Sequence, residues 1–107
     1  MISRIWHGWT TAENADAYER LLEDEIFPGI EAKGVAGYVG IDLLRRPIEA
    51  GEVEFITIMW LDSLDAVRAF AGEDYETAYV PDAARRVLSR FDAHSAHYEV
   101  RVRRRYS

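Results

Sequence analysis

The feature that most constrains the fold is a run of strand-forming residues that is apolar on both of its sides. Residues 52–60 read Glu-Val-Glu-Phe-Ile-Thr-Ile-Met-Trp, and residues 38–46 form a second run rich in β-branched and aromatic residues. Residues 47–51 lie between them and favour a hairpin. An antiparallel strand carries apolar side chains on both faces only when both faces are covered. The later run therefore predicts a central strand. A hairpin folded about its midpoint would place Arg45 opposite Glu54 as a cross-strand ion pair.

The N-terminal half supplies another strand and an amphipathic helix. Residues 2–10 alternate Ile5, His7 and Trp9 with Arg4, Trp6 and Gly8, which predicts a strand. Thr10 and Thr11 are competing helix caps, and apolar residues then recur at helical spacing as far as Ile30. Pro28 is expected to bend or end this helix, and Gly34 closes the segment.

The C-terminal half repeats the pattern of helix and strand. Ser63 is the predicted cap of a second helix that ends at Gly72. Residues 74–80 are expected to form a short helical turn, and Pro81 to start a further helix that runs through Phe91. Residues 93–103 alternate apolar and polar side chains and predict the last strand.

The element order predicts one α+β domain over residues 1–107, with a ferredoxin-like βαββαβ topology and a four-stranded antiparallel sheet. Both helices would then cover one face of the sheet and leave the other face open. Strands with bulky side chains on both sides would expose an apolar patch larger than a soluble monomer tolerates. We therefore expect a homodimer of the dimeric α+β barrel type, in which two open faces pair. The alternative is that the C-terminal residues of the same chain fold over the open face.

Composition and charge exclude several kinds of site. The chain has no cysteine, which removes disulfides, thiolate nucleophiles and cysteine-ligated metals. The net charge is −6, and four of the basic residues are confined to Arg101, Arg103, Arg104 and Arg105 near the C-terminus. An acidic body of this kind repels nucleic acid. We find no membrane span and no apolar segment typical of a signal peptide, so we expect a cytoplasmic protein that binds neither nucleic acid nor membranes.

Several short motifs resemble one protein family over almost the whole chain. They are Trp6-His7-Gly8 on the first strand, Trp60 followed by Asp62-Ser63-Leu64-Asp65-Ala66, then Phe70-Ala71-Gly72-Glu73-Asp74, and finally His97-Tyr98-Glu99-Val100. The combination resembles the antibiotic-biosynthesis-monooxygenase-like proteins of the dimeric α+β barrel superfamily. The resemblance implies the fold more strongly than the activity, because members of this superfamily differ widely in what they do.

The resemblance implies monooxygenase chemistry, but this chain departs from the known catalytic sets. Trp60 matches the tryptophan of the members that oxidise polyketide phenols without a cofactor, whereas Ile56 and Val67 stand where those proteins have an asparagine and a tyrosine. Phe70 and Val80 stand where the haem-degrading members have a tryptophan and the axial histidine. The departures argue against haem degradation, and we predict no cofactor and no metal.

Two histidines are the candidate catalytic residues. His7 and His97 lie on the first and last strands, which are antiparallel neighbours in this topology, and a register that pairs them would place the two imidazoles side by side. Histidine titrates near neutral pH and could remove a proton from a phenol or an enol. Two alternatives stay open: a hydrogen-bonded pair of structural histidines, or a metal site completed by Glu99.

Three aromatic residues are the candidate substrate-binding residues. Trp9 and Trp60 are expected to form walls for a planar ligand, unless they belong to the core or to an interface. Tyr75 lies beside the loop that would close the cavity. Two functions follow: a cofactor-independent monooxygenase-type enzyme that acts on an aromatic or phenolic metabolite, or a non-catalytic homodimer that binds a small molecule or serves a structural role.

Overall fold

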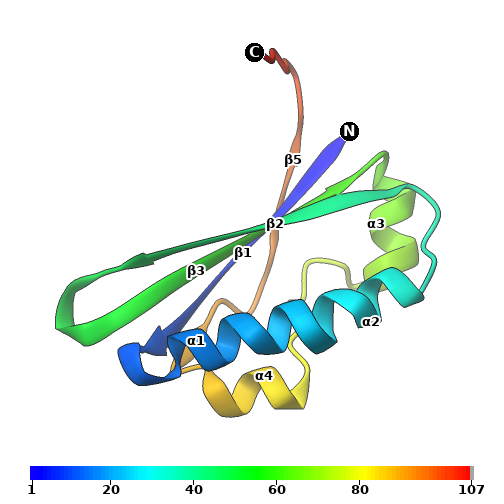
Figure 1. Cartoon of the computed structure of the whole chain (residues 1–107). Coiled ribbons are helices and arrows are strands. Elements are labelled where there is room, and N and C mark those ends of the chain that lie inside the picture. The colour runs from blue at the N-terminus through cyan, green and yellow to red at the C-terminus, as the bar shows by residue number, and fades with distance from the viewer. Residues whose placement is uncertain (107) are drawn as a thin grey trace.

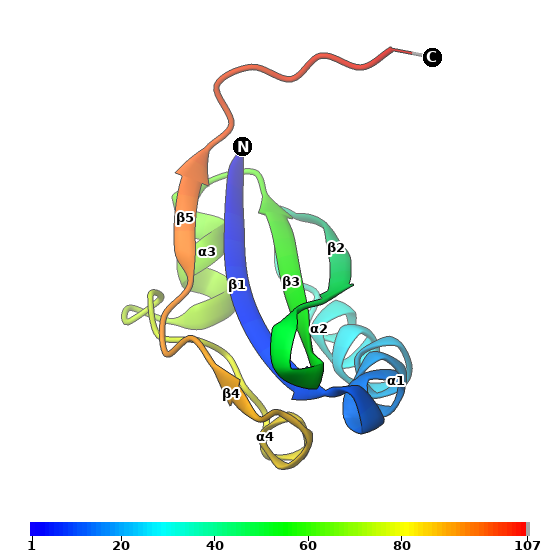
Figure 2. The ribbon, with the colours of Figure 1, turned by 90° about the vertical axis from the view of Figure 1, so that its left-hand side faces the viewer.

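The computed structural model describes residues 1–106, which form one antiparallel sheet with helices on one of its faces (Figure 1). The strands are β1 (Ile2–Thr11), β2 (Tyr38–Pro47), β3 (Glu52–Leu61), β4 (Arg90–Phe91) and β5 (Ala96–Glu99). Their order is β2-β3-β1, and both β4 and β5 pair with the free edge of β1 (Figure 2). The predicted α+β class and ferredoxin-like topology are confirmed, with β1 and β3 at the centre.

The sheet has five strands instead of the predicted four, because Arg90 and Phe91, which were expected to be helical, pair with β1 as β4. Residues 93–95 turn away from β1 and bond to the loop before α4: Ala78 N donates to Ala93 O, and Ser95 N donates to Glu76 O. An isolated bridge between Thr77 and His94 lies in the same place. The strand predicted over residues 93–103 is therefore limited to Ala96–Glu99. Of the helical turn expected at residues 74–80, only the bond from Thr77 N to Asp74 O forms, because Glu76 O and Ala78 N pair with residues 93–95.

The helices begin and end close to the predicted caps. They are α1 (Ala12–Leu21), a π-helical turn (Leu22–Ile26), α2 (Phe27–Ala32), α3 (Leu64–Ala71) and α4 (Asp82–Val87). Of the two competing caps, Thr11 is the one used, because its hydroxyl accepts from Asn14 N. Pro28 does not end the helical segment: α2 follows directly on the π-helical turn and continues to Ala32. The helix predicted to reach Phe91 stops at Val87, since the chain then enters β4.

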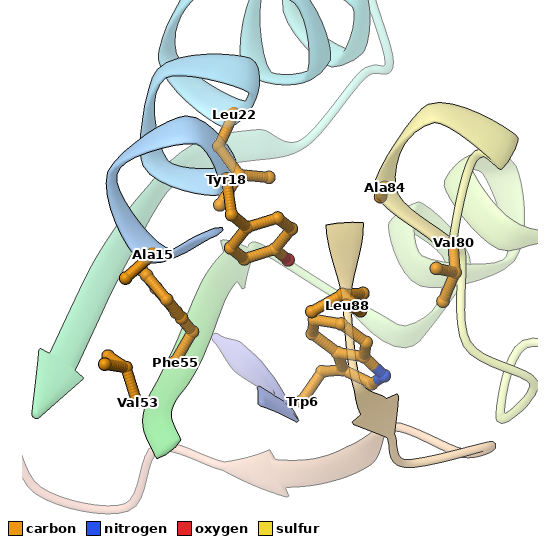
Figure 3. Packing of buried hydrophobic residues seen from close by; sticks show 9 residues of the cluster. All are labelled: Trp6, Ala15, Tyr18, Leu22, Val53, Phe55, Val80, Ala84 and Leu88. Atoms are coloured by element: carbon orange, nitrogen blue, oxygen red, sulfur yellow. The ribbon is translucent and has the colours of Figure 1, made fainter. Parts of the chain in front are cut away.

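The covered face holds the hydrophobic core (Figure 3). Tyr18 of α1 packs edge-on against Phe55 of β3, with ring centroids 4.8 Å apart. Trp6 of β1 lies beside Leu88, and its indole N–H donates to Asp92 O at 2.7 Å. A Cβ at Gly8 would lie 2.7 Å from the Trp6 ring, so the glycine makes room for the tryptophan. The core therefore fixes the helices to β1 and β3.

The other face of the sheet carries no helix (Figure 1). Its central positions are apolar across the strands: Ile5 pairs with Ile58, and Leu44 pairs with Ile56. Leu44 is 45% exposed. We call this surface the open face. Its apolar centre confirms that β3 presents bulky residues on both sides.

The register of the β2–β3 hairpin corrects one prediction. Arg46, not Arg45, pairs with Glu54, because the turn aligns Pro47 with Val53. Arg46 Nε donates to Glu54 Oε1 at 2.7 Å on the open face. Arg45 points to the covered side and bonds to Asp16 and Glu19 of α1. The one-residue shift exchanges the faces of the two arginines.

Within residues 1–106, no helix combines the length and the apolar character that a membrane crossing requires.

Candidate functional site

A cavity lies between the sheet and the helices on the covered face. Its walls are mostly apolar and come from every layer of the fold: Trp6, Tyr18, Leu22, Ile26, Phe27, Ile30, Ile41, Met59, Phe70, Tyr79, Val80, Pro81 and Ala84, with Arg4, Thr57 and Ser95 as the polar members. The cavity volume is about 60 Å³. This is room for several waters. An apolar hollow with a few polar groups is the usual form of a small-molecule site.

Arg4 is the charged group of this cavity. Its side chain points from β1 to the covered face, and the residue is only 4% exposed. The guanidinium donates to the backbone oxygens of Tyr75 and Thr77 and contacts His97 Nε2 at 2.9 Å. Among residues 1–106, no carboxylate lies within ion-pair distance of it. Burial lowers the pKa of Arg4 to about 10, so the group stays charged at neutral pH.

His97 is held in one protonation state by this arginine. A guanidinium has donors and no acceptor, so His97 Nε2 must accept the hydrogen bond from Arg4. The ring is therefore neutral, with its proton on Nδ1. Burial and, second to it, the positive charge of Arg4 lower the pKa of His97, while Glu76 opposes them. The ring also packs edge-on against Tyr75 at 5.2 Å between centroids.

Tyr18 is a second polar group in the cavity wall. Its ring extends from α1 toward Trp6 and Leu88, with the hydroxyl at the inner end (Figure 3). The residue is only 1% exposed and forms part of the cavity wall. Burial raises the pKa of Tyr18, so the hydroxyl keeps its proton.

The predicted pairing of the two histidines is wrong. In the β1–β5 register His97 pairs with Arg4, and His7 lies three residues further along β1. Because side chains alternate along a strand, His7 points to the open face and His97 to the covered face. His7 Nδ1 contacts Glu54 Oε2 at 3.2 Å. A metal site shared by His7, His97 and Glu99 is excluded for the same reason, and residues 1–106 contain no cluster of three candidate metal ligands.

The predicted aromatic residues also divide between the two faces. Trp9 stacks on His7 on the open face and lies under the Arg90 guanidinium, which is 4.0 Å from the ring centroid. Trp60 is on the same face, where its indole N–H donates to Asp42 at 3.0 Å and Arg103 lies 4.9 Å above its ring. Tyr75 instead joins His97 in a surface groove on the outer side of Arg4. The structure thus brings together Tyr75 with His97, and His7 with Trp9.

Arg4 and Tyr18 are the polar cavity residues that the sequence reasoning missed. The signal for Arg4 was present, because it occupies the same strand parity as Trp6 and Gly8, which both face the helices. A charge in that row is a candidate for a buried functional group. Tyr18 offered no such signal, since an aromatic residue in an apolar helix stripe is ordinary core material.

The fold and the site define a class: a ferredoxin-like α+β domain with a mostly apolar cavity between its sheet and its helices. A structure that it resembles is the crystal structure of a "putative antibiotic biosynthesis monooxygenase" from Bacillus cereus. The match has a TM-score of 0.58 and 16% sequence identity, and it covers 98% of this chain and 96% of that one. No family model and no curated protein sequence matches the chain.

At this identity the match establishes the fold. The resemblance to antibiotic-biosynthesis-monooxygenase-like proteins that the sequence motifs indicated is therefore confirmed for the architecture, over nearly the whole chain.

Proposed function

We propose that the chain is a small-molecule enzyme of the monooxygenase type, which binds an aromatic or phenolic metabolite in the covered-face cavity. The observation that supports this most is Arg4 at the polar end of an apolar cavity, in contact with His97, which lines the groove on the outer side of Arg4. An apolar wall orients a planar ring, and a histidine beside it supplies a group that takes up a proton.

The chemistry needs no separate reductant. A phenol gives up its proton to His97, and the resulting phenolate, which is carbanion-like at a ring carbon, forms a carbon–oxygen bond with O₂. Protonation yields a hydroperoxide. Loss of water then breaks the oxygen–oxygen bond and leaves a quinone, so that 1-naphthol and O₂ give naphthoquinone and water. The substrate supplies all of the electrons.

His97 is the proposed base, on the condition that Arg4 releases its hydrogen bond to the His97 ring. Its Nε2 lone pair accepts a bond from Arg4. It therefore takes up a proton only when a substrate oxygen replaces it as the partner of Arg4. His7 is not part of the proposed site, because it lies on the other side of the sheet and bonds to Glu54. Trp9 and Trp60 share that open face.

We also propose that the open face pairs two copies of the chain. Its centre is apolar, with Ile5, Ile56 and Ile58 adjacent across β1 and β3. Its ends are polar, as in the Arg46–Glu54 ion pair. An apolar centre with a polar rim is the usual anatomy of a protein interface. Arg103 and Trp60 lie at the edge of this face, and the tail beyond Val100 extends away from the domain (Figure 2).

The proposed reaction is tested with 1-naphthol and ¹⁸O₂, by an oxygen electrode and mass spectrometry of the product. We expect oxygen uptake above the uncatalysed rate and one ¹⁸O atom in the naphthoquinone. His97→Gln keeps an acceptor for Arg4 but removes the base, so it should lower the rate by about 100-fold or more. His7→Gln is the matched control and should leave the rate unchanged. Binding of 1-naphthol without any product would favour a non-catalytic binding protein instead.

A further inference from the structure

We infer that the cavity binds its ligand as an anion, with Arg4 holding a phenolate or similar organic oxyanion. This inference rests on the proposed function for the location of the ligand and goes beyond it in assigning the ligand's charge. Arg4 is thereby the residue that selects the ligand.

The first argument is the charge balance around Arg4. Moving a guanidinium out of water costs several kcal/mol unless an anion compensates it. Arg4 is 4% exposed, and its partners are two backbone oxygens and a neutral imidazole. Three hydrogen bonds leave some guanidinium donors unused. An oxyanion in the cavity would supply both the missing charge and the missing acceptor.

The second argument is that the neighbouring charges do not already supply that anion. Both Arg4 and Lys33 lie against the Phe70 ring, at 5.6 and 4.9 Å from its centroid. Lys33 also lies 4.3 Å from the centroid of Tyr79, another residue of the cavity wall. Glu76 acts on His97, on the groove side. The cavity end is therefore positive, with a second cation near the first.

The third argument is the shape of the cavity. Apart from Arg4, Thr57, Ser95 and the Tyr18 hydroxyl, its wall is apolar. Such a wall favours a ligand with one charged end and an apolar ring. Inorganic anions and polyanions would leave that wall in contact with water, so an aromatic oxyanion fits better than phosphate.

The test uses 4-nitrophenol, whose phenol and phenolate forms have different absorption spectra. At a pH where the free compound is mostly protonated, excess protein should convert it to the phenolate spectrum. We expect at least about a tenfold preference for the anion, which is one unit of pKa of the bound phenol. Arg4→Gln should abolish this shift. Arg103→Gln combined with Arg104→Gln and Arg105→Gln should retain it, because these tail arginines are distant from the cavity.

A second measurement keeps the inference testable if Arg4→Gln does not fold. In the unaltered protein, benzoate should displace 4-nitrophenol at least tenfold better than benzamide, which has the same shape and no charge. Equal displacement by both compounds, bound nitrophenol with a phenol spectrum, absence of binding, or loss of the shift in the tail variant would each overturn the inference. None of these readouts requires turnover, so oxygenation of 1-naphthol can succeed or fail independently of them.

Discussion

The two faces of the sheet differ in whether their buried charged side chains have ion-pair partners. On the open face, the carboxylate of Glu54 is paired, with Arg46 Nε at 2.7 Å and His7 Nδ1 at 3.2 Å. On the covered face, Arg4 is buried without a carboxylate among residues 1–106. Both residues are buried, with Glu54 8% and Arg4 4% exposed. A buried charge that is paired is explained by its partner, whereas a buried charge without a counter-ion needs another explanation, such as a ligand. The covered face is therefore the better candidate for a ligand-binding site.

The largest expected effect comes from substituting two adjacent residues of β3 that point to opposite faces of the sheet. Phe55 is fully buried on the covered face and packs on Tyr18. Phe55→Ala should lower the free energy of unfolding by about 3–5 kcal/mol, because it removes a large buried ring and leaves a cavity. Ile56→Ala, on the open face, is the matched control and should cost much less at a protein concentration low enough to separate the proposed dimer. Urea denaturation measures both. Similar losses in the two variants would contradict the division of the core described above.

The assembly proposed for the open face gives an effect of intermediate size. We expect light scattering to return twice the chain mass of 12.3 kDa. Ile56→Asp should shift the sample to monomers, with a loss of about 2–3 kcal/mol in association free energy, because it buries a carboxylate at the centre of the interface. Ala17→Asp, on the exposed side of α1, should leave the mass unchanged. A well-folded unaltered protein with the mass of a single chain would contradict the dimer.

The smallest effect is in the pH dependence of stability. The pKa of His97 is lowered in the folded protein, so the unfolded chain binds more protons as the pH falls below about 6.5. Stability should therefore decrease through that range and level off below the folded pKa. His97→Gln should remove this dependence. The pKa of Glu54 is lowered chiefly by its bond to Arg46. Protonation of this carboxylate should therefore destabilise the protein only at more acidic pH. Thermal unfolding from pH 8 to 4 separates the two, and a His97→Gln curve identical to that of the unaltered protein would disprove the assignment.

The fold was largely predictable because its signals are local. The apolar run that became β3 predicted a central strand, and the caps at Thr11 and Ser63 predicted where two helices begin. The predictions that failed depended on distant partners. Residues 74–80 are not helical because their backbone bonds to residues 93–95, and nothing within the segment itself indicates this pairing.

The candidate site was predictable only in part, because it also depends on contacts between residues that are distant in the sequence. Strand parity placed Arg4, Trp6 and Gly8 on one face and His7 and Trp9 on the other, and the structure confirms that division. Parity does not give the register between two strands. The offset that pairs His97 with Arg4 rather than His7 depends on where the chain leaves β4 and enters β5.

The sequence by itself determined the element order, the alternation of faces and the apolar character of both sides of β3, because these follow from short-range periodicity and backbone preference. Only the tertiary structure decided which charged groups meet. Contacts such as Arg4 with His97 join residues that are 93 positions apart in the chain. A one-residue change in register would send either side chain to the opposite face of the sheet.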